Sequence, residues 1–233
     1  MQTLGRIVSS RFVRHGGFPL VVLGVLAGCA TPTRVAVAEP ANLYPHKVEL
    51  RAYVDSGRYQ AGLEQVAARA LAWVEGRASR RLPAERLAVV FDLDETLLLN
   101  WPSISQNDFG YIPPLWEQWV DQAAAPAIES VREVYRAARK REIAVFYITG
   151  RSERDRVGTE RNLRLIDCAD HVELICKPSE VKQTSAAFKT AARERLTRDG
   201  YTIIANLGDQ ESDLVGGFSE RTFKLPNPFY QTF

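Results

Sequence analysis

Two aspartates, Asp92 and Asp94, stand two residues apart directly after the apolar run 87–91, in the stretch FDLDETLLL. The run is typical of a buried strand, and open α/β sheets bind ligands at the carboxyl ends of such strands. Two carboxylates at one strand end repel each other, and a hard cation such as Mg²⁺ relieves that repulsion while attracting a phosphate. The pair therefore indicates metal-assisted phosphoryl chemistry. The alternative is an acidic turn before a helix, where the helix dipole favours Asp and Glu.

Two further apolar runs end in residues that suit a phosphate or a metal ion. The run IAVFYI ends in Thr149, Gly150 and Arg151, which offer a hydroxyl, an approachable backbone N–H and a charged fork. The run YTIIANL ends in the acidic loop GDQESD, which contains Asp209 and Asp213. Three strand ends of this kind are hard to explain by turn chemistry alone.

In this order the motifs resemble those of the haloacid-dehalogenase (HAD) superfamily, and within it the secreted acid phosphatases that include bacterial outer-membrane lipoprotein phosphatases and plant vegetative storage proteins. The resemblance is carried by FDLDETLLLN, by YITGR followed by Thr159, Asn162 and Leu163, by GYTIIANLGDQESDL, and by FKLPNPFY. It implies an α/β fold, a HAD-like Rossmannoid parallel sheet sandwiched by helices, with a small helical cap. It also implies an acid phosphatase that hydrolyses small phosphomonoesters, nucleoside monophosphates among them.

The resemblance assigns roles to the strand-end residues. Asp92 would be the nucleophile and must stay ionised, whereas Asp94 would be the general acid and then the base, which requires a raised pKa. Mg²⁺ would bind the Asp92 carboxylate, the backbone carbonyl of Asp94 and Asp209. Asp213 would complete the shell directly or, as we prefer, orient a metal-bound water. Thr149 would bind the phosphate as a catalytic residue.

The family also has a lysine on the helix before the last catalytic strand, where it neutralises phosphate charge and keeps the nucleophile ionised. Three lysines compete for this role, Lys177, Lys182 and Lys189. We favour Lys189, because KTAARERLTRDGYTIIANLGD has the family's register to the GD pair, and Lys182 is the second choice. For each of them the alternative is a solvated charge on a helix face.

Substrate contacts are expected from the phosphate side and from the cap. Gly150 and Arg151 would bind the phosphate, while Tyr111 and Tyr230 would contact the leaving group. Tyr111 lies in an insertion, residues 100–125, that is rich in aromatic side chains able to stack on a planar group. Two tryptophans of this insertion, Trp116 and Trp119, have helical spacing and are equally explained as the core of the cap.

Helical and strand patterns alternate along the rest of the chain. Apolar residues recur at helical spacing in four segments, residues 59–78, 128–138, 155–166 and 181–198. Helices that alternate with buried strands are typical of a parallel sheet with right-handed crossovers. We therefore expect one phosphatase domain over residues 43–233, with cap elements from about 43–80 and 100–125.

The first 28 residues have the features of a signal peptide. They contain three arginines and no acid, followed by an apolar stretch too short to span a bilayer. Cys29 follows small residues and resembles the lipidated cysteine of a bacterial lipobox; ordinary cleavage with a free thiol is the alternative. Residues 29–42 would then tether the domain to the outer membrane, with the domain in the periplasm or at the cell surface.

Charge and cysteine content narrow the remaining possibilities. Of the 30 basic residues the leader holds three, so the remainder carries 27 against 28 acidic residues, a balance that does not suggest binding of nucleic-acid polymers. Cys168 and Cys176 could form a disulfide in an oxidising compartment or be small buried residues.

The oligomeric state is left open, with a homodimer as one possibility. A non-catalytic binding or storage protein, or a phosphotransferase, is the alternative to a hydrolase.

Overall fold

The structure is a computed structural model that describes residues 39–178 and 183–232. The predicted signal peptide, Cys29, most of the predicted tether and Lys182 lie outside the described residues. Among the helices that are described, none combines the length and the apolar character needed to cross a membrane.

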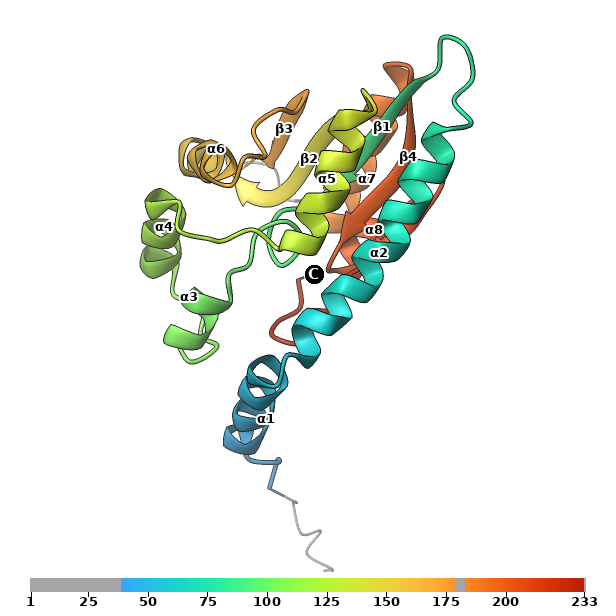
Figure 1. Ribbon diagram of the computed structural model, residues 1–233. Coiled ribbons are helices and arrows are strands. Elements are labelled where there is room, and N and C mark those ends of the chain that lie inside the picture. The colour runs from blue at the N-terminus through green and yellow to red at the C-terminus, as the bar shows by residue number, and fades with distance from the viewer. Residues whose placement is uncertain (1–38, 179–182, 233) are drawn as a thin grey trace, which may run out of the picture. The chain divides into compact units, whose positions relative to one another are not determined.

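The centre of the domain is a parallel sheet of five strands in the order β3-β2-β1-β4-β5 (Figure 1). The strands are β1 (Arg86–Phe91), β2 (Ala144–Ser152), β3 (Glu173–Lys177), β4 (Tyr201–Gly208) and β5 (Thr222–Lys224). The three apolar runs of the sequence form β1, β2 and β4, which are neighbours at the middle of the sheet. Because Phe91 pairs with both Tyr147 and Leu207, the residues that follow these strands meet at one edge.

Helices cover both faces of the sheet. Alternate residues of β1 face opposite cores: Val89 belongs to a large core with α2 (Arg58–Ala78) and α5 (Glu129–Lys140), and Val90 to a smaller core with α7 (Ser185–Arg198). Figure 1 shows α2 and α5 on the near side of the sheet and α7 behind it. This is the sandwiched parallel sheet that the sequence predicts.

The remaining helices lie near the carboxyl edge of the strands or outside the sheet layers. They are α1 (Leu43–Asp55), α3 (Trp101–Gln106), α4 (Pro113–Gln122), α6 (Arg156–Leu165) and α8 (Glu211–Leu214), with the short 3-10 helix η1 (Glu153–Asp155) before α6. Of the segment 43–80 that was expected in the cap, α2 instead packs on the sheet. The helix α1 contacts the insertion through Lys47, whose Nζ donates to Asp108 Oδ2 at 2.6 Å.

The cap helix α4 is seated on α6. A Cβ atom built on Gly158 would lie 2.5 Å from the carbonyl oxygen of Val120, so only glycine permits this approach. Arg161 Nη1 donates to the carbonyl oxygen of Asp121 at 2.8 Å, and the side chain of Asn162 bonds both backbone groups of Ala125. These contacts explain why the segment after TGR contains a glycine and an asparagine.

Two cysteines lie in the described part of the chain. Cys168 and Cys176 are both buried and both free thiols, so the structure does not contain the disulfide that the sequence left open. Burial raises the pKa of Cys168 to about 12 and that of Cys176 to about 11. They behave as small buried apolar residues.

Candidate active site

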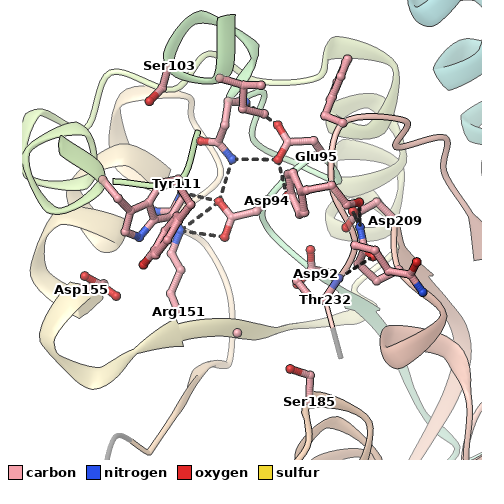
Figure 2. Close-up of a pocket in the computed structure, with 18 of the residues that line it drawn as sticks. Asp92, Asp94, Glu95, Ser103, Tyr111, Arg151, Asp155, Ser185, Asp209 and Thr232 are labelled. Atoms are coloured by element: carbon pink, nitrogen blue, oxygen red, sulfur yellow. Dashed lines mark hydrogen bonds and ion pairs between the residues drawn. The ribbon is translucent and has the colours of Figure 1, made fainter. Parts of the chain in front are cut away.

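The carboxyl edge of the central strands opens into a cavity of about 1010 Å³ (Figure 2). The sequence-predicted residues that line it are Asp92, Asp94, Tyr111, Gly150, Arg151, Lys189, Asp209 and Tyr230. Asp213 lies beneath this lining, within reach of Asp92. Thr149 is fully buried and does not line the cavity.

Three buried carboxylates form a cluster at the base of the cavity. Asp92, Asp209 and Asp213 each offer one oxygen, and these oxygens lie within 4.8 Å of one another. Asp92 follows β1, Asp209 follows β4 and Asp213 lies in the short helix α8 just after it, so the register of the two strands brings the cluster together.

Lys189 is the cation of this cluster. Its Nζ donates to Asp92 Oδ1 at 2.5 Å and to Asp213 Oδ1 at 2.6 Å, and the side chain is only 5% exposed. The residue is placed by α7, whose N-cap Thr184 accepts a hydrogen bond from the N–H of Ala187. Burial lowers the pKa of Lys189, but Asp92 and Asp213 raise it more, so the ammonium form is favoured. Lys177 makes no comparable contact, and Lys182 lies outside the described residues.

The pKa values of Asp92 and Asp94 are shifted in the opposite sense to the sequence prediction. Burial raises the pKa of Asp92 well above its ordinary value, since Lys189 only partly offsets the cost of burying charge beside Asp213 and Asp209. Burial also favours protonation of Asp94, but its ion pair with Arg151 dominates and lowers the pKa of this carboxyl. The expectation that Asp94 carries a raised pKa is therefore wrong for this structure.

The guanidinium of Arg151 forms an ion pair with the carboxylate of Asp94. Its Nε lies 3.1 Å from both carboxylate oxygens of Asp94, and Nη2 donates to Oδ1 at 2.7 Å (Figure 2). Nη1 donates to Thr159 Oγ1 at 3.0 Å. In this structure the guanidinium therefore binds a carboxylate, because that carboxylate is the nearest anion, and the role of Arg151 as a phosphate ligand stays a prediction.

Thr149 and Gly150 differ from one another in their surroundings. The Oγ1 of Thr149 accepts a hydrogen bond from the backbone N–H of Arg151 at 3.1 Å, and the residue is fully buried near the end of β2. Its predicted contact with phosphate stays a prediction. Gly150 lines the cavity. A Cβ atom at this position would meet no atom within 4 Å, so a larger residue would fit there without a clash.

Glu95 is a site residue that the sequence reasoning did not single out. It is fully buried with a positive φ of 53°, and its carboxylate accepts from the backbone N–H of Asn100 at 2.7 Å and from the hydroxyl of Tyr230 at 2.5 Å. Burial, followed by the charge of Asp94, raises the pKa of Glu95 to about 8. Tyr230 therefore points its hydroxyl at Glu95, while Tyr111 is exposed at the mouth of the cavity.

Two further residues, Asn227 and Gln210, orient the carboxylates of Asp209 and Asp213. Asn227 Nδ2 donates to Asp209 Oδ2 at 2.7 Å, and Gln210 Nε2 donates to the same oxygen at 2.6 Å. Gln210 N also donates to Asp213 Oδ2 at 2.8 Å. The motif LPNPFY contains Asn227, but nothing in the sequence shows which acid the amide would meet.

Arg193 holds the loop that carries Asp213. It lies one helical turn after Lys189 and donates to the carbonyl oxygens of Asp213 at 2.6 Å and Gly217 at 3.0 Å. A Cβ built on Gly208 would lie 2.4 Å from the Cβ of Asp213, so glycine is required for this close turn. One face of α7 thus contacts both the side chain and the backbone of the same acidic loop.

The carboxylate cluster suits a divalent cation. Three carboxylates and one ammonium leave a net negative charge in a buried place, and burial raises the pKa of Asp92 and Asp209, which indicates incomplete charge compensation. Oxygen-only ligands at such a site are those that Mg²⁺ prefers. The side chain of Asp94 is not part of this cluster, because it is bound to Arg151.

Comparisons with known proteins agree with this geometry. The family model of the HAD superfamily, subfamily IIIB (acid phosphatase), matches residues 25–233. Acid phosphatase 1 of Solanum lycopersicum is 39% identical over 146 residues, covering 60% of this chain and 57% of the tomato protein. Vegetative storage protein 2 of Arabidopsis thaliana is 29% identical over 182 residues, covering 76% of this chain and 68% of that protein.

A solved structure has a similar fold. The class C acid phosphatase from Bacillus anthracis matches with a TM-score of 0.67 at 20% identity, over 81% of this chain and 86% of that one. The likeness shows that the two share an architecture. The chain spans less than two thirds of the tomato relative, so these matches by themselves do not transfer that protein's activity.

Proposed function

The chain belongs to subfamily IIIB of the HAD superfamily, the acid phosphatases, and from this membership we propose that it is a Mg²⁺-dependent hydrolase of small phosphomonoesters. The observation that supports the proposal most strongly is the position of Asp92. Its carboxylate lines a large cavity, contacts one ammonium and lies beside two further carboxylates. A phosphate in this cavity could thus contact a nucleophile, an ammonium group and a carboxylate cluster able to bind a metal ion.

In the proposed reaction Asp92 attacks the phosphorus atom, the bond to the leaving oxygen breaks, and an aspartyl phosphate forms on Asp92. A water molecule then hydrolyses this intermediate. Lys189 pairs with Asp92 and favours its ionised form, although burial opposes ionisation. The ammonium also offsets the charge of the phosphate as it approaches.

Asp94 would move the proton in both half-reactions. Its ion pair with Arg151 favours the ionised form, which is the form that can activate water. A phosphate dianion arriving beside Asp94 would favour the protonated form, which can donate to the leaving oxygen. The charge of the ligand would therefore set which of the two forms prevails.

The metal ion would be held by Asp92, Asp209 and Asp213, and by the backbone carbonyl of Asp94 if the family arrangement applies. When bound, it would supply positive charge against a phosphoryl oxygen. Asn227 and Gln210 already occupy Asp209 Oδ2, and Thr96 donates to Oδ1 at 3.3 Å. These bonds fix the orientation of Asp209 before any ion arrives.

Nucleoside monophosphates are the substrates that we propose within the phosphomonoester class. The mouth of the cavity has aromatic side chains, including Tyr111 and Trp116, whose ring centroids are 6.4 Å apart. Exposed rings at a cavity mouth can stack on a planar base. The cavity is also large enough for a nucleoside beyond the phosphate.

Storage is the second candidate, because a vegetative storage protein is among the relatives. Asp92 argues against it, since the nucleophile and its Lys189 partner are both present and in contact. A phosphotransferase would share the aspartyl phosphate and differ only in the hydroxyl that attacks it.

We propose in addition that cleavage before Cys29 leaves a lipidated cysteine that anchors the protein to an outer membrane. Support for this comes from the arginines, the short apolar stretch and the small residues before Cys29 in the sequence. Mass spectrometry of the protein from its host tests it, because an amino-terminal peptide without acyl mass at Cys29 would reject the anchor.

The catalytic proposal is tested with a panel of phosphomonoesters and Mg²⁺, using the parent protein and Asp92→Asn. We expect turnover by the parent and a loss of at least about 10³-fold in the variant, because no aspartyl phosphate can form. Circular dichroism checks that the variant is folded. Equal rates for the two proteins would reject Asp92 as nucleophile, and no turnover by the parent would favour the storage role.

A further inference from the structure

We propose that the cap helix α4 positions Asp94 through two tryptophans, Trp116 and Trp119, each of which holds one of the two side chains that bind the Asp94 carboxylate. The inference rests on the proposed function, in which Asp94 donates a proton to the leaving oxygen. Trp116 and Trp119 are positioning residues in this sense, acting through Arg151 and Asn100.

The first connection runs through Asn100. Trp119 Nε1 donates to Asn100 Oδ1 at 2.8 Å, and Asn100 Nδ2 donates to Asp94 Oδ1 at 2.8 Å. A side-chain amide has its acceptor at one end and its donors at the other, so the indole N–H fixes which end faces Asp94. If the amide rotated by half a turn, its oxygen would face the carboxylate and repel it. Asn100 is 1% exposed, so water does not replace the indole easily.

The second connection runs through Arg151. The guanidinium carbon of Arg151 lies 5.3 Å from the centroid of the Trp116 ring, while Nε and Nη2 bind Asp94. A cation over an indole face is stabilised by the ring's quadrupole, and the planar guanidinium is oriented by that contact. Thr159 accepts from Nη1 at 3.0 Å and fixes the other side of the group.

Both tryptophans belong to one rigid element. They are three residues apart on α4 and so lie on neighbouring positions of one helix face. The close contact of Gly158 with Val120 and the bond from Arg161 to Asp121 hold α4 on α6. A displacement of α4 would therefore move both partners of Asp94 together.

Only one of the two tryptophans can sense the leaving group. Trp116 lines the cavity, whereas Trp119 does not. A leaving group that contacts Trp116 thus touches the same ring that orients Arg151. The contact between Trp116 and Arg151 therefore links the position of α4 to the position of Asp94, the proposed proton donor.

Leaving-group dependence separates positioning of the acid from a general structural role. An alkyl phosphate such as glycerol 2-phosphate needs a proton on its leaving oxygen, whereas 2,4-dinitrophenyl phosphate expels a stable phenolate without one. Trp119→Phe removes the indole N–H and keeps an aromatic ring. We expect it to lower kcat/KM, which reports the steps up to expulsion of the leaving group, by about 10- to 100-fold for the alkyl ester and by less than about 2-fold for the dinitrophenyl ester.

Trp116→Leu should show the same selectivity through the other connection. The matched control is Gln118→Ala, on the exposed face of α4, which should leave both rates at the parental value. If kcat/KM of either tryptophan variant fell equally for both esters, or for neither, the positioning role would be rejected while the proposed function would stand.

A second measurement does not depend on turnover. In ¹⁵N-labelled protein, the Nε–H signal of Arg151 reports its bond to Asp94. We expect this signal to shift and to exchange faster with solvent in Trp116→Leu than in Gln118→Ala. A parent that hydrolyses neither ester would defeat the proposed function, and an unchanged Arg151 signal in Trp116→Leu would defeat the positioning role.

Discussion

Asn227 and Asp209 are joined by a hydrogen bond of 2.7 Å between the amide Nδ2 and the carboxylate Oδ2. The bond brings the segment after β5 to the carboxylate cluster, since Asp209 is one of its three members. Asn227 also accepts from the backbone N–H of Phe229 at 2.9 Å, so its amide is held at both ends. The asparagine of LPNPFY is thereby part of the candidate metal site.

Asn227→Ala should weaken metal binding. The substitution removes one of two donors on Asp209 Oδ2, and loss of such an outer-shell partner typically costs about 10- to 100-fold in metal affinity. Isothermal titration with Mg²⁺ measures it. Gln231→Ala is the control, because that residue lies near in sequence and makes no hydrogen bond to Asp209. An affinity equal to that of the parent would show that Gln210 alone orients Asp209.

Lys189→Met should make the thermal stability of the protein more dependent on divalent metal. Removing the ammonium that pairs with Asp92 and Asp213 leaves unpaired buried charge, which typically costs about 3–5 kcal/mol of folding free energy. We expect a lower Tm without Mg²⁺, a larger rise in Tm on adding Mg²⁺ than in the parent, and loss of turnover. Lys182→Ala is the comparison: parental behaviour of Lys189→Met with loss in Lys182→Ala would transfer the role to Lys182.

Chelation of divalent metal should lower both stability and turnover. A ligand at about 100 times its Kd stabilises the folded state by roughly 2.7 kcal/mol, so Tm should rise with Mg²⁺ concentration after treatment with EDTA. Asp209→Asn should abolish most of this rise, because the carboxylate would no longer attract the ion. A Tm that did not respond to Mg²⁺ in the parent would contradict the metal assignment.

Tyr230→Phe should destabilise the protein without removing a catalytic group. The hydroxyl of Tyr230 donates to Glu95 at 2.5 Å, and loss of a hydrogen bond to a buried carboxyl group costs about 1–3 kcal/mol. Chemical denaturation measures the change in the free energy of unfolding. Tyr44→Phe is the matched control, since Tyr44 is 71% exposed and its hydroxyl makes no hydrogen bond. Equal stabilities for the two variants would show that the bond to Glu95 contributes nothing.

Gly158→Ala should loosen the seat of α4. The added methyl group would lie 2.5 Å from the carbonyl oxygen of Val120, so the two helices must separate. Overpacking of this kind typically costs about 1–3 kcal/mol. Gly76→Ala, in α2 with no atom within 4 Å of the new Cβ, should instead stabilise by about 0.5–1 kcal/mol. Thermal unfolding of both variants compares them, and a stable Gly158→Ala would contradict the tight contact.

The strands and the acidic cluster could be predicted because they depend on local pattern and on strand order. The apolar run before Asp92 and the run before Asp209 end at the same edge once the sheet is parallel, and the structure has that sheet. Register to the GD pair also singled out Lys189, whose Nζ lies against Asp92. The similar fold of the class C acid phosphatase agrees with the predicted architecture.

Side-chain partners could not be predicted in the same way. Arg151 follows a strand end like a phosphate ligand, but it pairs with Asp94, which is 57 residues away in the chain. Periodicity assigned the segment 59–78 to a helix without showing whether it packs on the sheet or in the cap. The sequence shows Glu95 only as part of the motif DET. Its role could not be predicted, because its hydrogen-bond partners are Asn100 and Tyr230, the second of which is 135 residues away in the chain.

The bond between Glu95 and Tyr230 joins the first catalytic loop to a segment translated long after it. A ribosome must therefore synthesise nearly the whole domain before the cavity has all its walls. A nascent chain in which Asp92 has been made but Tyr230 has not therefore lacks part of the pocket around Asp92. The proposed catalytic activity would then arise only at the completion of folding.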